Sequence, residues 1–122
     1  MIGFVIFDNK FNYYEKDYFI ERFVLEDGSL CDSRQTSCIY ALYFDLLPDE
    51  NSVEKVTKQL VDNIEAAGNK LQTGFLGTPF ILPTLTKVGR SDVAYKVLLQ
   101  HDYPSWLYTV DNGATTMWEH WN

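Results

Sequence analysis

Apolar residues recur at helical spacing along most of this 122-residue chain, and the stretches end at glycines, prolines or turn sequences. The clearest stretch starts at Asn51, where Glu54 three residues later completes a capping-box pattern, and stops at Gly68. Its predicted buried stripe is Val53, Val56, Leu60 and Ile64. A helix with one apolar face must cover that face with a neighbour, so the pattern predicts packed helices.

We predict six further helices from the same signals. They cover residues 14–23, 39–46, 78–88, 91–98 and about 104–112, with a last one starting at Thr116. Thr78 and Ser91 are the expected N-caps of two of them, and Pro48 is the expected stop of the second. Because short connections favour antiparallel neighbours, we expect an all-α fold made of a row of helical hairpins.

Composition limits the class of partner. Hydrophobic residues make up 46% of the chain, which is enough for one folded domain, and the net charge of −7 disfavours nucleic acid and anionic membranes. No Lys or Arg follows Lys96, so the acidic and aromatic C-terminal third suits a neutral sugar. Residues 2–7 lack the features of a signal peptide, no segment has the length of a membrane span, and the compartment stays undetermined.

The two cysteines, Cys31 and Cys38, do not predict a metal site. They are seven residues apart, they form no CxxC pair, and the chain has only two histidines. A disulfide has no support in this spacing either. We predict free thiols, with Cys38 buried on a helix.

Three motifs resemble one enzyme family when they are taken together. They are 73–79 (TGFLGTP), 103–108 (YPSWLY) and 113–121 (GATTMWEHW), preceded by a stretch over 27–48 in which Gln35-Thr36 opens a helix. They resemble the closing part of the catalytic domain of bacterial α-L-rhamnosidases. The resemblance covers about residues 11–122 and leaves 1–10 unassigned. It implies a partial (α/α)6 toroid, the C-terminal half of a six-hairpin glycosidase domain, and it implies no cofactor.

The resemblance also implies a role for Glu119. In this family an acid protonates the leaving oxygen while an opposite carboxylate activates water, and the two stand roughly 6.5 to 9.5 Å apart. Glu119 matches the water-activating base, and Trp118 and Trp121 would place it in a weakly solvated wall that raises its pKa. The family's general acid lies upstream of the matched part, so we expect little or no turnover from these residues alone. Spacing alone allows a second role, because Thr116 and Glu119 also fit a capping box.

Four aromatic side chains are candidate substrate contacts. Trp106 and Tyr108 lie in the 103–108 motif, where one ring could stack on a sugar or both could pack between helices. Phe75 is a candidate for lining the cleft beside Glu119, with helix packing as its alternative, and Trp118 completes the predicted set. The glycines of these motifs are expected to serve backbone turns and close approach.

Other classes of function stay open at this level. Another toroid glycosidase, of the glucuronyl hydrolase or trehalase type, would share the architecture and change the sugar. A non-catalytic carbohydrate-binding or interaction domain is the alternative that is not an enzyme. Since half a toroid leaves apolar helix faces uncovered, we also predict a homo-oligomer, in the form of a dimer.

Overall fold

The computed structural model of the chain describes residues 13–74 and 77–116, and the regular elements among these residues are helices. Strand-like pairing within them is limited to one antiparallel bridge between Val24 and Leu30. The predicted all-α fold is therefore confirmed. The elements are α1 (Tyr13–Phe23), α2 (Gln35–Tyr43), α3 (Glu50–Ala66), the 3-10 helix η2 (Thr78–Phe80), α4 (Ile81–Lys87), α5 (Ser91–Leu98) and α6 (Trp106–Asp111).

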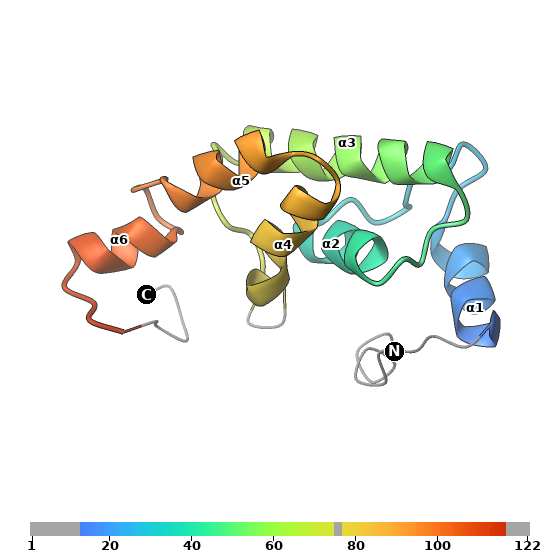
Figure 1. Ribbon diagram of the computed structural model, residues 1–122, viewed down its shortest axis with the longest axis horizontal. Helices are drawn as coiled ribbons and strands as arrows, with labels where there is room; N and C mark the ends of the chain where they lie inside the picture. Colours follow the sequence, from blue (N-terminus) through green and yellow to red (C-terminus); the bar gives the residue numbers. More distant parts are fainter. Residues whose placement is uncertain (1–12, 75–76, 117–122) are drawn as a thin grey trace.

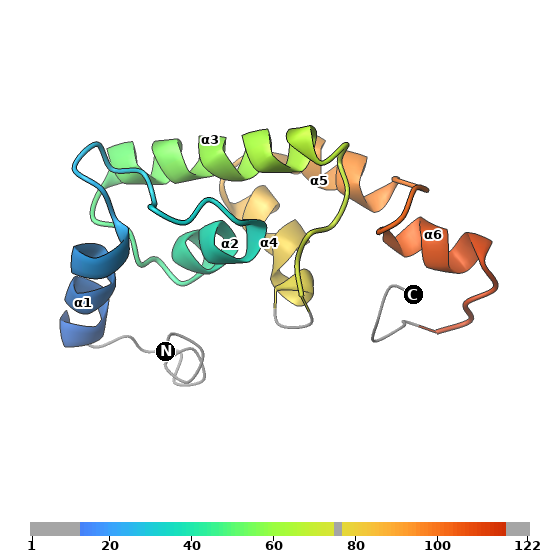
Figure 2. The ribbon, with the colours of Figure 1, turned by 180° about the vertical axis from the view of Figure 1, so that it is seen from behind.

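The helices form an elongated layer with α3 along one side (Figure 1). α2 and α3 pack together and run in opposite directions, as two views of the ribbon show (Figures 1 and 2). α4 and η2 pack on α2, and α5 packs on α4. α1 and α6 lie at opposite ends of the layer (Figure 2).

The core lies between α2, α3 and α4. Val56, Leu60 and Ile64 of the predicted stripe are fully buried, but Val53 is 37% exposed, so its prediction is wrong. Ser52 is buried in its place, because the turn at Gly28 packs on that side of the helix and Gly28 O accepts a hydrogen bond from the Ser52 hydroxyl. Largest among the remaining fully buried side chains are Ile39, Leu46, Leu71, Ile81, Leu85, Gln35, Val93, Val97 and Thr84.

The start of α3 differs from its prediction. Asp49, rather than Asn51, is the N-cap, and its carboxylate accepts a hydrogen bond from the Ser52 N–H at 2.8 Å. The Asn51 amide instead donates to Asp27 O at 3.2 Å. A contact with a segment 24 residues away therefore removes Asn51 from the capping position.

The starts of η2 and α5 also lack their predicted caps. Gly77 and Arg90 hold the N-cap positions and make no side-chain cap bond. The Thr78 hydroxyl lies inside η2 and donates backward to Gly74 O at 3.0 Å, while Ser91 is the first residue of α5. Each helix therefore begins at the residue that was expected to cap it, one position earlier than predicted.

The ends of the helices follow glycines more closely than prolines. Gly68 and Gly89 take φ values of 73° and 78°, which end α3 and the α4 segment as predicted. α2 ends at Tyr43, before the expected stop at Pro48, because Asp45 adopts a φ of 54° and the Leu46 N–H returns to Ala41 O at 3.0 Å.

The cysteine prediction is confirmed. Cys31 and Cys38 are free thiols, and Cys38 is buried on α2. No helix among residues 13–74 and 77–116 has the length and apolarity to cross a membrane.

Candidate active site

Gln35, the first residue of α2, holds the segment that leads into the 73–79 motif. The Gln72 N–H donates to Gln35 Oε1 at 2.9 Å, and Gln35 Nε2 donates to Lys70 O at 3.2 Å. Gln35 is only 1% exposed, so these bonds also satisfy an amide that burial removes from water. The segment between α3 and η2 thereby gains a fixed place without being part of a helix.

A hydrogen bond between two threonine hydroxyl groups joins the beginning and the end of the 73–79 motif. Thr73 Oγ1 and Thr78 Oγ1 lie 2.7 Å apart, and the Gly77 and Thr78 N–H groups donate to Gly74 O at 3.0 and 3.1 Å. A Cβ on Gly77 would lie 2.7 Å from Thr36 Oγ1, so Gly77 lets this turn approach α2 closely. This confirms the predicted role of Gly77 in close approach.

One backbone hydrogen bond joins the residues just before the 73–79 segment to the 103–108 segment. The Leu71 N–H donates to Pro104 O at 3.0 Å, and Leu71 is 1% exposed. The next residue, Ser105, caps α6 by accepting from the Tyr108 N–H at 3.2 Å. The structure therefore brings together two segments that the sequence places about 30 residues apart.

The two candidate rings of α6 have different surroundings. Trp106 packs against the core and lines a cavity of about 480 Å³ between α4, α5 and α6. Tyr108 lies outside that lining, and its ring contacts Tyr103 edge to face at a centroid distance of 5.2 Å. The other residues of the cavity are Leu82, Leu98, Thr109, Val110, Ala114, Thr115 and Thr116.

The cavity is lined by a residue that lies close to the predicted base in the sequence. Its last lining residue, Thr116, directly precedes the part of the motif that carries Trp118 and Glu119. Those two residues, and Phe75 of the 73–79 motif, lie outside the described residues, as does the helix expected from Thr116. Their site roles therefore stay predictions.

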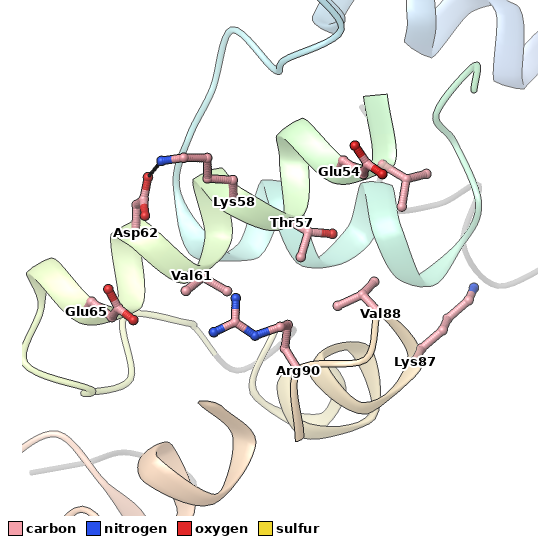
Figure 3. A pocket seen from close by; sticks show the side chains of 10 residues that line it. Glu54, Thr57, Lys58, Val61, Asp62, Glu65, Lys87, Val88 and Arg90 are labelled. Carbon is pink, nitrogen blue, oxygen red and sulfur yellow. Dashed lines mark hydrogen bonds and ion pairs between the residues drawn. The ribbon is translucent and has the colours of Figure 1, made fainter. Parts of the chain in front are cut away.

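A larger groove of about 570 Å³ lies between α3 and the turn from α4 to α5 (Figure 3). It contains none of the predicted site residues. Its cations already have carboxylate partners: Lys58 pairs with Asp62 at 2.7 Å, Lys87 with Asp45 at 2.9 Å, and Arg90 with Asp92 at 3.1 Å. The groove is thus a solvated surface of mixed charge rather than an anion site.

Asp111 has a partner of its own at the end of α6. His101 Nδ1 lies 2.6 Å from Asp111 Oδ2, with both side chains exposed. Asp111 is followed by Asn112 and by Gly113 with a φ of 92°, as expected for a turn. Within the described part of the chain, no group of three or more His, Cys, Asp or Glu side chains could hold a metal ion.

Comparison with known proteins identifies the family. The model of the bacterial α-L-rhamnosidase six-hairpin glycosidase domain matches residues 10–122. An α-L-rhamnosidase of Formosa agariphila is 45% identical over 104 residues, which cover 84% of this chain and 11% of that protein. An α-L-rhamnosidase of Streptomyces avermitilis is 44% identical over 100 residues, which cover 82% of this chain and 10% of that protein.

This chain belongs to the α-L-rhamnosidase six-hairpin glycosidase family. Solved structures of family members share its fold. The native α-L-rhamnosidase of Aspergillus terreus matches 88% of this chain and 12% of its own, with a TM-score of 0.85 and 37% identity. The Streptomyces avermitilis enzyme, in a complex with L-rhamnose, matches 88% of this chain and 10% of its own, with a TM-score of 0.83 and 42% identity.

Family membership confirms the predicted architecture. The described helices are part of a six-hairpin glycosidase domain, and the chain spans about a tenth of the length of these relatives. The sequence identified the motif that contains Gln35, but it indicated only that Gln35 opens a helix. The two hydrogen bonds to residues 35 and 37 positions away had no signal in the local sequence.

Proposed function

We propose that this chain forms the C-terminal part of the catalytic domain of an α-L-rhamnosidase that removes terminal α-linked L-rhamnose with inversion. The main support is that the family match extends over residues 10–122, a range that contains all three motifs. The Leu71–Pro104 bond, which ties the residues just before the 73–79 motif to the 103–108 motif, also supports this proposal. A relative that shares 42% identity is known in a complex with L-rhamnose.

In this proposal Glu119 is the general base. It accepts a proton from water as that water attacks the anomeric carbon, and a carboxylic acid on the opposite side of the sugar protonates the leaving oxygen. Trp106, Tyr108, Phe75 and Trp118 contact the sugar. The reaction needs two carboxyl groups and the residues that position them.

The role of Glu119 can be tested in a completed domain, made by joining this chain to the upstream helices of the Streptomyces avermitilis relative. Glu119→Gln is expected to reduce kcat on an aryl rhamnoside by a factor on the order of 100 or more, with little change in sugar affinity. Glutamine keeps the shape of the side chain but does not accept the proton. The capping-box role predicts unchanged kcat, since glutamine also fits a capping box.

Asp102→Asn is the matched control, because Asp102 is an exposed acid in the same C-terminal third. It should leave kcat unchanged. Equal kcat in Glu119→Gln and the wild-type domain would remove Glu119 from the mechanism.

We propose further that the 122 residues alone do not hydrolyse rhamnosides. The general acid that the family resemblance places upstream is not matched within them, and losing one acid or base costs roughly 10² to 10⁴ in rate. Turnover of an aryl rhamnoside by the purified chain, abolished in Glu119→Gln, would contradict this.

We also propose that the isolated chain forms a dimer through α5 and α6. Several large apolar side chains are exposed there, including Tyr95 at 63%, Leu99 at 62% and Val110 at 57%. Light scattering at tens of micromolar should give a dimer mass, and Leu99→Lys should shift it toward the monomer. Even weak dimers associate at roughly these concentrations, so a monomer mass for the wild-type chain would refute the proposal.

A further inference from the structure

We propose that Gln35 and Thr36 are positioning residues for the two candidate sugar-binding segments, 73–79 and 103–108. Their role rests on the proposed function, because it concerns the placement of the residues that would contact the sugar. Neither side chain is among the predicted substrate contacts. Both act through the backbone of the segments that they hold.

The side chain of Gln35 makes hydrogen bonds to the backbone of residues 70–72 like those that a neighbouring strand would make. Its amide accepts from the Gln72 N–H and donates to Lys70 O, so one side chain satisfies the backbone on both sides of Leu71. The same segment also bonds through Leu71 to Pro104 O on its other side. Residues 70–72 are thus held between the start of α2 and the turn before α6.

The placement of α6 depends on Gln35 through the backbone of residues 70–72. Pro104 precedes Ser105, whose side chain caps α6, and Trp106 is the first residue of that helix. A shift of the 70–72 backbone therefore moves the start of α6 together with the ring that lines the 480 Å³ cavity. Active sites tolerate such displacements poorly, since misplacement by about 1 Å can cost 100-fold in rate.

Thr36 acts on the other end of the 73–79 segment. A Cβ atom added to Gly77 would lie 2.7 Å from Thr36 Oγ1 and 3.2 Å from Thr36 Cγ2. Thr36 therefore packs directly against the backbone of Gly77. Gln35 and Thr36 thereby fix the backbone before and after the turn that closes through Thr73 and Thr78.

The chain contains a matched control for Gln35. Gln59 of α3 also accepts one backbone bond and donates another, in this case to a single residue of another extended segment: the Leu30 N–H donates to Gln59 Oε1 at 2.9 Å, and Gln59 Nε2 donates to Leu30 O at 3.0 Å. Leu30 lies in the connection between α1 and α2, away from both candidate segments in the sequence. A purely structural role predicts the same consequences for Gln35→Met and Gln59→Met.

The test compares wild type, Gln35→Met and Gln59→Met by ¹⁵N NMR on the 122-residue chain. Gln35→Met should shift the amide signals of 71–78 and 105–108 and the Trp106 indole signal, while Gln59→Met should shift signals near Leu30 and leave those segments unchanged. Shifts in 71–78 that do not extend to 105–108, or equal effects of both variants on α6, would overturn the proposal.

Amide exchange on the wild-type chain gives a second result that does not depend on a variant folding. The Leu71 and Gln72 amides should exchange on the order of 100-fold more slowly than unprotected amides, although they lie outside any helix, because both are bonded in the interior. Exchange at the unprotected rate would overturn the proposal.

Titration with L-rhamnose separates this proposal from the proposed function. Where the wild-type chain binds, Gln35→Met should weaken binding by about tenfold, a 1.4 kcal/mol effect, and Gln59→Met should not change it. Equal weakening in both variants would overturn the positioning role. Absence of binding, with the expected spectra, would count against a sugar contact in these segments and would leave the positioning supported.

Discussion

The contact between Gly77 and Thr36 can be tested by adding a single methyl group. Gly77 has φ −91° and ψ −30°, which alanine adopts without strain, so backbone preference does not oppose Gly77→Ala. The new Cβ would however lie 2.7 Å from Thr36 Oγ1 and 3.2 Å from both Thr36 Cγ2 and Thr73 Cβ. Rotation of Thr36 offers little relief, because one branch of its side chain replaces the other.

The expected magnitude combines two opposing effects. Overpacking of this kind costs about 1 to 3 kcal/mol, while replacing glycine by alanine restricts the unfolded chain and returns about 0.4 to 1 kcal/mol. We therefore expect Gly77→Ala to lower the free energy of unfolding by about 1 to 2 kcal/mol. For a domain of this size the melting temperature should fall by about 4 to 8 °C.

Gly74→Ala is the matched control, three residues away. A Cβ there would meet no atom within 4 Å, and the φ of Gly74 lies outside the left-handed region. This variant should be stabilised by about 0.4 to 1 kcal/mol. The assay is urea unfolding followed by circular dichroism, and Thr36→Ala combined with Gly77→Ala should recover most of the loss. Equal stability of the two glycine variants would refute the steric argument.

Three further outcomes follow from local contacts. The guanidinium of Arg34 holds the pKa of Asp32 well below its usual 3.8, so the stabilisation that Asp32 provides should be present above about pH 4 and lost as the pH falls further. Asp32→Asn should therefore lower stability at pH 7, by about 1 kcal/mol or less because its partner Arg34 is largely exposed, and match wild type more closely as the pH falls below 3.8 in urea unfolding curves. Burial raises the pKa of the Cys38 thiol to about 12, so a thiol reagent at pH 8 should label the exposed Cys31 in the native chain and reach Cys38 only after unfolding; labelling of both at one rate would contradict this. Ser105→Ala, which removes the cap of α6, should cost about 1 kcal/mol in thermal unfolding, and an unchanged melting temperature would show that the cap contributes nothing.

Helix positions were largely predictable because they depend on local spacing. Val56, Leu60 and Ile64 recur at helical intervals, and Gly68 and Gly89 stand where a left-handed backbone ends a helix. These properties belong to short windows of sequence, so they survive without knowledge of the tertiary structure.

Helix starts were less predictable, because capping side chains have competing partners. Asn51 meets the local rule for an N-cap, yet its amide binds Asp27 O, and Asp49 caps α3. Local propensity does not reveal a partner 24 residues away.

The candidate site shows the same division. The sequence by itself determined the family, the aromatic candidates Trp106 and Tyr108, and the motif that contains Gln35 and Thr36. The tertiary structure alone decided that Trp106 faces a cavity while Tyr108 packs on Tyr103, and that Gln35 holds the backbone around Leu71. The physical reason is that motifs specify side-chain chemistry, whereas hydrogen bonds and ring contacts between distant segments exist only after folding has brought those segments together.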